Sequence, residues 1–171
     1  WNAGAYRCTQ IKDRNGNYIT IAYGAFGQLD TMTETLGRVV TVTYDAGGYP
    51  SAITQTWKDN NGSGSNVTYS WASFTYTTQN INTNFGSLDV IGIPNGTALK
   101  VLDRITYTDQ SYTKFSHNSY GQVWKVQNYA ADNHELNYVK TNLETPAATN
   151  SDSPKLEWTD SYVENFNNGN L

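Results

Sequence analysis

Residues 13–53 read DRNGNYITIAYGAFGQLDTMTETLGRVVTVTYDAGGYPSAI, and this stretch decides the fold. Glycines 16, 27, 37 and 48 recur in it every ten or eleven residues. Glycine adopts positive φ without a steric penalty, so it is favoured where a chain turns back. The residues between the glycines alternate, so that each of two sets shares one face of a strand: Ile19, Ile21 and Tyr23, and Val40, Val42 and Tyr44. The pattern predicts consecutive antiparallel hairpins.

Two of the expected strands end in the same way, with Tyr23 and Gly27 in one and Tyr44 and Gly48 in the other. This spacing resembles the RHS or YD-repeat family, whose repeat is Tyr-Asp-x-x-Gly-Arg-hydrophobic with a further glycine midway. The Tyr-Asp-x-x-Gly part occurs at residues 44–48 and the Gly-Arg-hydrophobic step at residues 37–39. Variants of the turn occur at 13–17 and at 118–123, where His117 stands in place of tyrosine. The resemblance covers residues 11–57 and 101–141.

The resemblance assigns a structural role at the repeat turns to Asp13, Gly16, Tyr23, Gly27, Gly37, Arg38, Tyr44, Asp45, Gly48, Asn118 and Gly121. It implies an all-β chain whose hairpins form one coiled, twisted sheet with little helix. In this family many repeats build a hollow shell that serves as scaffold, in bacterial proteins that are secreted or held at the cell surface. The family's closing Asp-Pro-x-Gly-Leu motif is absent here, and 171 residues are too few to close a shell.

The composition narrows the function classes. The 13 Tyr and 5 Trp supply large apolar area, while charged residues make up only 15% of the chain and mean hydropathy is −0.61. A net charge of −4 without any basic run argues against nucleic acid, and no apolar run is long enough to insert into a membrane. Cys8 is the single cysteine, so we expect no internal disulfide and a partly buried thiol. The chain begins at Trp1, which leaves processing and a segment of a longer chain both open.

The rhythm divides the chain into a repeat block at 11–57, an irregular insert at 58–98, a second block at 99–141 and a polar tail at 142–171. Together they predict roughly nine to twelve antiparallel strands within one β-domain or a segment of a longer repeat protein. Within 66–77 the aromatic residues occupy odd positions up to Trp71 and even positions from Phe74. A bulge near Ala72 or Ser73 would bring both sets to the same face of the strand. We expect one short helical turn within 160–166.

No catalytic, cofactor-binding or metal-binding pattern occurs in the sequence, so we expect no enzyme and no cofactor. We expect His117 to be packed or at an edge, and His134 to lie exposed in a turn. Residues 13–17 lack the ligands of a calcium loop, so we expect Asp13 and Asp45 to accept hydrogen bonds from backbone N–H groups in their own turns. Candidate glycosylation sites are Asn61, Asn66 and Asn95.

Three functions remain open. The first is an extracellular structural module that joins flanking repeats or copies of itself into a shell or filament. The second is a carbohydrate- or surface-binding module for adhesion, and burial of all three of Trp57, Trp71 and Trp124 would leave little surface for glycans to stack on. The third is an enzyme. An open sheet end exposes unpaired backbone groups, and this favours the first function.

Overall fold

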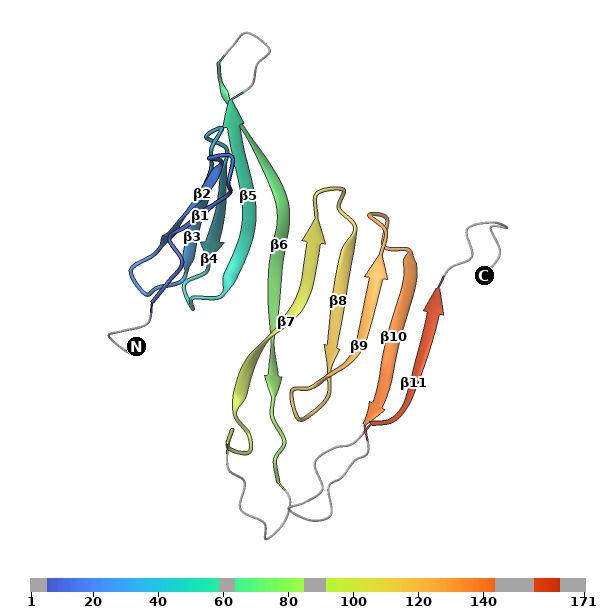
Figure 1. The fold of residues 1–171 in the computed structure, drawn as a ribbon. Helices are drawn as coiled ribbons and strands as arrows, with labels where there is room; N and C mark the ends of the chain where they lie inside the picture. The colour runs from blue at the N-terminus through green and yellow to red at the C-terminus, as the bar shows by residue number, and fades with distance from the viewer. Residues whose placement is uncertain (1–5, 59–63, 85–91, 144–155, 164–171) are drawn as a thin grey trace. The chain divides into compact units, whose positions relative to one another are not determined.

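The computed structural model describes residues 6–58, 64–84, 92–143 and 156–163, and it is an all-β structure (Figure 1). The described part contains no helix, which confirms the predicted fold class and strand number. The eleven strands are β1 (Gln10–Lys12), β2 (Tyr18–Tyr23), β3 (Leu29–Glu34), β4 (Val39–Tyr44), β5 (Pro50–Lys58), β6 (Asn66–Asn80), β7 (Ala98–Tyr107), β8 (Tyr112–His117), β9 (Val123–Tyr129), β10 (Glu135–Leu143) and β11 (Leu156–Val163).

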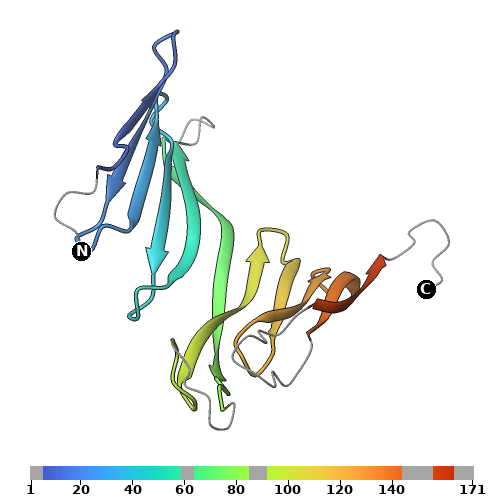
Figure 2. The ribbon, with the colours of Figure 1, turned by 60° about the horizontal axis from the view of Figure 1, so that its bottom comes forward.

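The order of strands in the sheet is the order of strands in the chain, from β1 to β11. Each strand from β2 to β10 therefore pairs with the strand before it and the strand after it, as predicted for consecutive hairpins. Backbone contacts divide the chain within β6 into an N-terminal unit, residues 1–73, and a C-terminal unit, residues 74–171. Figure 2 shows β2–β5 side by side in the first unit and β7–β11 side by side in the second.

The N-terminal unit gathers its large apolar side chains on one face of the sheet. Ile21 pairs with Met32, and Met32 pairs with Val40, so the two alternating sets seen in the sequence share this face. Val42 continues the face onto Ile53 of β5. Large aliphatic residues in register across strands bury apolar area between neighbours, and that stabilises the pairing.

The opposite face of the same unit carries small β-branched polar residues. Thr31 pairs with Thr41, Thr41 pairs with Thr54, and the Thr56 hydroxyl lies 3.0 Å from the Thr68 hydroxyl. Threonine fits an extended backbone and can hydrogen-bond across strands. The alternation of Thr with aliphatic residues therefore makes a two-faced sheet.

The aromatic strand β6 contains the expected bulge. Ile53 pairs with Ala72 but Thr54 pairs with Ser70, so Trp71 is the extra residue. The bulge confirms the predicted irregularity, one residue before the expected place. It brings the odd-numbered set before it and the even-numbered set after it to the same face.

Two sequence-based expectations change with the structure. The stretch expected as an irregular insert contains β6, and its residues 59–63 and 85–91 lie outside the described part. The helical turn expected within 160–166 is wrong for residues 160–163, which belong to β11; there Asp160 pairs with Lys140 and Tyr162 with Tyr138. No short turn joins β10 to β11, because β10 ends at Leu143 and β11 begins at Leu156. A hairpin pattern in the sequence therefore could not predict β11.

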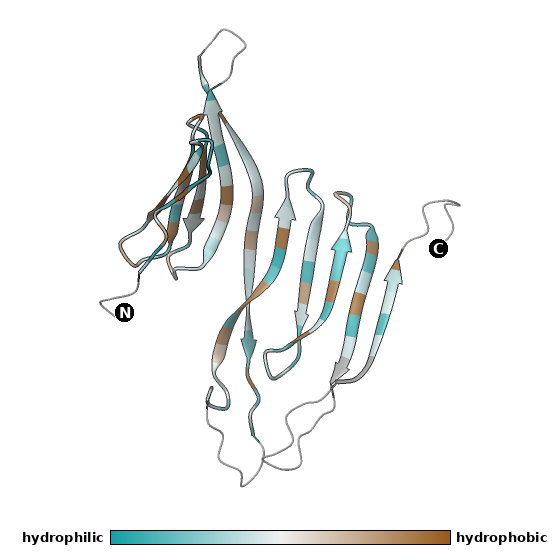
Figure 3. Cartoon of the chain, viewed as in Figure 1, coloured by the Kyte–Doolittle hydropathy of each residue, from teal (hydrophilic) through white to brown (hydrophobic). Residues whose placement is uncertain are grey.

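Burial is concentrated in the C-terminal unit. Among the described residues, the buried ones are Ile81 (2% exposed), Val101 (9%), Thr113 and Gln127 (8% each). Thr113 donates a hydrogen bond to Asn128 Oδ1 at 2.6 Å, and Asn128 donates to Asn137 at 2.7 Å, so buried polar groups are paired. Hydrophobic and hydrophilic residues alternate along β9 and β10 in Figure 3.

The described part of the N-terminal unit contains no side chain as buried as these. Its apolar face is half-buried by neighbours within the sheet. Globular domains usually bury a sheet face against a second layer. The unit is thus a single-layer sheet whose stability rests on cross-strand contacts and turns.

Candidate functional site

The most regular feature of the structure is a five-residue turn that joins neighbouring strands. In each turn the first residue donates its N–H to the carbonyl of the fifth, and the fourth donates its N–H to the carbonyl of the first, at 2.8–3.3 Å. The turns occupy residues 13–17, 24–28, 34–38, 45–49, 107–111, 118–122 and 130–134. The same local geometry thus recurs in both units.

The fourth residue of every one of these turns has positive φ. It is glycine in five of them, with φ between 77° and 91°: Gly16, Gly27, Gly37, Gly48 and Gly121. In the other two turns the position is taken by Gln110 (φ 68°) and Asn133 (φ 70°). These two turns are not recognisable by the glycine pattern in the sequence, because neither has glycine at the fourth position. The signal that finds them is an aspartate one residue earlier, Asp109 or Asp132.

Side-chain oxygens complete the turns. Where the first residue is Asp or Asn, its Oδ1 accepts the N–H groups of the third and fifth residues at 2.8–3.0 Å, as Asp13, Asp45 and Asn118 do. This confirms the expectation for Asp13 and Asp45. Where the first residue is Tyr or Ala, the third residue acts instead, and Asp109 and Asp132 each accept the N–H of the fifth at 3.0 Å. Every such bond satisfies a donor that the strand ladder leaves unpaired.

Gln110→Gly should stabilise the protein by about 1 kcal/mol, because a residue with a β-carbon is strained at positive φ and glycine is not. Asn133→Gly should have a smaller effect, since asparagine tolerates this region better than glutamine. Urea unfolding of the two variants and the wild type measures both. Equal effects at the two positions would contradict the strain argument.

Asp109 should make the free energy of unfolding depend on pH in the acidic range. Hydrogen bonds from the Ser111 hydroxyl and N–H lower the pKa of Asp109 from its ordinary value of 3.8. The unfolded chain therefore binds the proton more readily, and the stabilisation present above pH 3.8 should be lost as pH falls through the folded pKa. Asp109→Asn keeps an acceptor that does not titrate, so its unfolding free energy should fall less between neutral and acidic pH. An identical decline in both proteins would contradict this.

The two repeat tyrosines make equivalent contacts. Tyr23 ends β2 and donates its hydroxyl proton to the Cys8 carbonyl at 2.9 Å; Tyr44 ends β4 and donates to the Leu29 carbonyl at 2.7 Å. Both side chains lie on the apolar face, and in both cases the acceptor is fifteen residues earlier. Both strands have a register shift at the tyrosine. Tyr44 thus ties the end of β4 to the start of β3, and Tyr23 ties the end of β2 to the segment just before β1.

Two arginines reinforce particular turns. The Arg7 guanidinium lies over the Tyr23 ring at 5.2 Å and against Gly27, where a β-carbon would overlap it. Arg38 forms an ion pair with Glu34, the first residue of its own turn, and this hydrogen bond lowers the pKa of Glu34. Arg7 was missed by sequence reasoning, because its contact with Gly27 crosses from one hairpin to the next.

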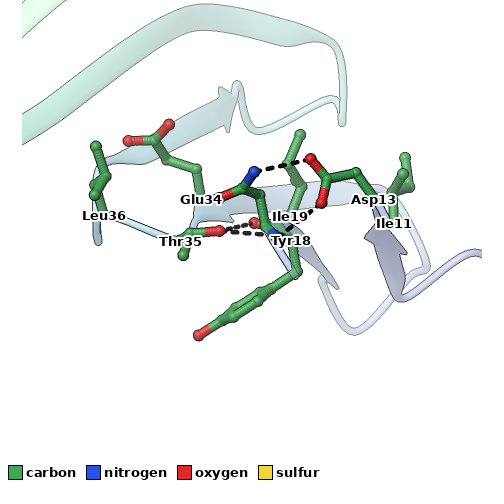
Figure 4. A pocket seen from close by; sticks show the side chains of 8 residues that line it. Ile11, Asp13, Tyr18, Ile19, Glu34, Thr35 and Leu36 are labelled. Atoms are coloured by element: carbon green, nitrogen blue, oxygen red, sulfur yellow. Dashed lines mark hydrogen bonds between the residues drawn. The ribbon is translucent and has the colours of Figure 1, made fainter. Parts of the chain in front are cut away.

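A shallow hollow of about 390 Å³ lies where β1, β2 and the β3–β4 turn meet (Figure 4). The Thr35 hydroxyl accepts the Tyr18 N–H at 2.7 Å and donates to the Tyr18 carbonyl at 3.0 Å, so one side chain extends the backbone ladder. Leu36 and Ile11 mark opposite ends of the hollow in Figure 4. The exposed surface of its lining is mostly apolar, and the carboxylates of Asp13 and Glu34 also line it.

Aromatic side chains on β5 and β6 pack on one another. The rings of Trp57 and Tyr69 are 6.1 Å apart with a 46° tilt, and those of Tyr69 and Trp71 are 5.0 Å apart edge to face. The Trp71 indole donates to Gln55 Oε1 at 3.0 Å. Trp71 is 50% exposed and Trp124 38% exposed, so the tryptophans are not all inside. The tilted rings do not form one flat platform.

The remaining candidate residues have ordinary surroundings. Cys8 is exposed, which corrects the partly buried thiol expected from sequence. His117 is partly buried, and burial lowers its pKa. Asn66 and Asn95 are exposed; Asn61 lies outside the described residues. Within the described ranges there is no cluster of His, Cys, Asp and Glu able to hold a metal, and no helix able to cross a membrane.

Solved structures share this fold. The crystal structure of TcdB2–TccC3 with Cdc42 matches with a TM-score of 0.51 and 15% identity, over 75% of this chain and 5% of that chain. The Photorhabdus luminescens Tc holotoxin pore with a mutated TccC3 matches with a TM-score of 0.52 and 15% identity, over 77% and 5%. At this identity the likeness shows the fold alone, and this chain spans about one twentieth of those chains. No family profile and no curated protein matches the sequence.

Proposed function

We propose that this chain is a non-enzymatic, extracellular or cell-surface segment of an RHS or YD-repeat sheet, and that its partners are flanking repeats or copies of itself. The observation that carries the proposal is the strand order. Eleven strands follow one another in sequence order through recurring five-residue turns, and neither β1 nor β11 has a second partner strand in the described part of the chain.

The two end strands differ in a way that favours growth at β11. β1 has three residues, whereas β11 has eight and contains no proline or lysine. A long edge strand offers a row of free N–H and C=O groups, while a short one offers few. The single-layer N-terminal unit supports the same proposal, because repeat modules gain stability from neighbours rather than from a core of their own. The fold shared with the Tc toxin chains is also consistent with a scaffold segment.

Sedimentation over a range of concentrations tests the proposal. The wild-type chain should gain mass with concentration through strand addition at β11. Asp160→Pro and Ser161→Pro form a matched pair, because neighbouring residues in a strand point their N–H groups in opposite directions. One variant removes a donor to β10 and should destabilise the fold; the other removes a donor on the open edge and should stop the mass increase with little loss of stability.

Ile11→Pro, in the edge strand β1, serves as the control. It should reduce assembly less than whichever of Asp160→Pro and Ser161→Pro removes the N–H on the open edge of β11. A chain that stays monomeric at all concentrations would contradict assembly through copies. The adhesion function would then take first place.

A further inference from the structure

The basic side chains of the C-terminal unit lie on one face of its sheet. Arg104 pairs with Lys114, and Lys125 pairs with Lys140, each directly opposite across neighbouring strands. Ser116, two residues along β8 from Lys114, pairs with Lys125 and joins the two pairs on one face. Lys100 is four residues before Arg104 on β7, so the two side chains point to the same face of the strand. All the Lys and Arg residues that the structure describes in this unit therefore occupy one face, the tyrosine–cation face: Lys100, Arg104, Lys114, Lys125 and Lys140.

Tyrosine rings hold most of these cations in place. The Arg104 guanidinium lies 4.5 Å from the Tyr112 ring centre, and the Lys125 ammonium lies 4.5 Å from that of Tyr138. The Lys140 ammonium is 5.5 Å from the same Tyr138 ring and 3.0 Å from Asp160 Oδ2. Such contacts fix long flexible side chains before a ligand arrives, which lowers the entropy lost on binding.

The cations form a band with one member on each of four successive strands, at Arg104, Lys114, Lys125 and Lys140. Neighbouring strands are about 4.8 Å apart, so Arg104 with Lys114 and Lys125 with Lys140 form two directly opposed pairs, and the step from Lys114 to Lys125 is a longer diagonal. Like charges directly opposite each other in a sheet are destabilising. The Lys125–Lys140 pair has the Asp160 carboxylate at Lys140 only, so an anion between the two ammonium groups would relieve their repulsion.

The same face offers sites for hydroxyl groups. A hollow of about 420 Å³ is lined by His134, Glu135, Tyr138 and Tyr162, next to the band. The rings of Tyr138 and Tyr162 stack 5.7 Å apart at its wall. Glu135 accepts the Tyr129 hydroxyl at 3.1 Å, so its carboxylate already serves a hydroxyl donor. Sugar rings suit such a place, because they present both hydroxyl donors and apolar C–H faces.

We propose that the tyrosine–cation face of β7–β10 binds a linear polyuronate, a glycan with one carboxylate on each pyranose ring. Its carboxylates meet the two directly opposed pairs of cations, Arg104 with Lys114 and Lys125 with Lys140. The glycan runs across the strands and shifts by two residues between β8 and β9. Its hydroxyls donate to Glu135 and its rings lie against the tyrosines. This function goes beyond the scaffold and does not depend on assembly.

Two other polyanions fit the face less well. An extended acidic peptide supplies carboxylates but no pyranose ring to lie against the stacked Tyr138 and Tyr162 rings. Nucleic acid binding rests on phosphate contacts alone over much of its length. Both offer fewer hydroxyl donors than a glycan to the carboxylates of Glu135 and Asp160.

Calorimetric titration of the full chain with oligogalacturonate of defined length tests the proposal. Lys125→Gln/Lys140→Gln should weaken binding about tenfold or more, and the salt dependence should decrease because fewer charges are neutralised. The matched control is Lys12→Gln/Lys58→Gln, which makes the same change in net charge in the N-terminal unit and should bind like wild type. Lys114→Gln changes an exposed side chain and should weaken binding without lowering the thermal unfolding temperature.

Two further ligands separate the alternatives. Methyl-esterified oligogalacturonate keeps the sugar and loses the charge, and it should bind far more weakly. Polyglutamate of matched charge should also bind more weakly; equal or tighter binding with the same variant dependence would show that the face takes acidic polypeptide and would overturn the proposal. Absence of oligogalacturonate binding, or equal losses in the control variant, would also overturn it.

Discussion

Gly121→Ala should destabilise the chain by roughly 2–5 kcal/mol, through two effects that act together. Gly121 has φ 81°, where a β-carbon costs about 1–2 kcal/mol. A β-carbon there would also stand 2.8 Å from Ile81 Cδ1, and Ile81 is 2% exposed. Overpacking against a buried side chain adds about 1–3 kcal/mol, because the neighbours have no free space to move into.

Gly48→Ala is the matched control for this change. Gly48 has nearly the same φ, 78°, and occupies the same place in its turn, but no atom lies within 4 Å of its would-be β-carbon. It should therefore lose only the backbone part, about 1–2 kcal/mol. Urea unfolding of both variants gives the difference. Equal losses would show that the contact between the β8–β9 turn and Ile81 does not matter to stability.

The contact with Ile81 also indicates how the segment after β6 is held. The Asn82 N–H donates to the Ser119 carbonyl at 2.7 Å, and the Ile81 N–H donates to the Thr97 carbonyl at 2.9 Å. Residues 81–84 are thereby joined to the β8–β9 turn and to the residue just before β7. A double variant, Gly121→Ala with Ile81→Val, should recover part of the lost stability, since the shorter side chain leaves room for the added methyl.

Tyr44→Ala should cost about 2–4 kcal/mol through loss of half-buried aromatic area at the end of β4. The hydroxyl contact to the Leu29 carbonyl, at 2.7 Å, is lost as well, and the carbonyl is left with one acceptor site unfilled. Tyr44→Phe keeps the ring and should cost about 1 kcal/mol, the usual net value of one hydrogen bond. The two variants together divide the effect into its apolar and polar parts.

The Tyr44 result has a natural comparison in Tyr23. Tyr23 makes the equivalent bond to the Cys8 carbonyl in a more exposed place, next to the short edge strand β1. Tyr23→Ala should therefore cost less than Tyr44→Ala, because less area is lost and the edge is less constrained. A loss below about 0.5 kcal/mol for Tyr44→Ala would contradict the structural role that the repeat pattern assigns to it.

The predictable part of the fold is the part that rests on local chemistry. A five-residue turn needs one residue at positive φ and an oxygen that accepts the turn's amides, and Asp45 with Gly48 shows both in the sequence. Gln110 shows the limit of this reasoning, since it occupies the glycine position without being a glycine. The fold of that turn is imposed by the pairing of β7 with β8, which outweighs the preference of one residue.

The candidate surfaces were less predictable than the turns. The sequence displays five described lysines and arginines scattered between residues 100 and 140, and nothing in their spacing indicates a common face. Their gathering follows from cross-strand register, including the register shift in β8–β9 pairing between Ser116 and His117. A shift of one residue would have sent half of them to the other side of the sheet.

The sequence by itself determined the all-β class, the hairpin rhythm and the residues of most turns, because glycine, aspartate and alternating side chains act over a few neighbouring residues. Only the tertiary structure decided that residues 66–80 and 156–163 are strands of the same sheet, that Arg7 lies on Gly27, that Ile81 lies on Gly121 and that the cations share a face. These features depend on partners distant in the chain. Whether two distant residues meet depends on the pairing register of every strand that lies between them. A local sequence pattern does not determine that register.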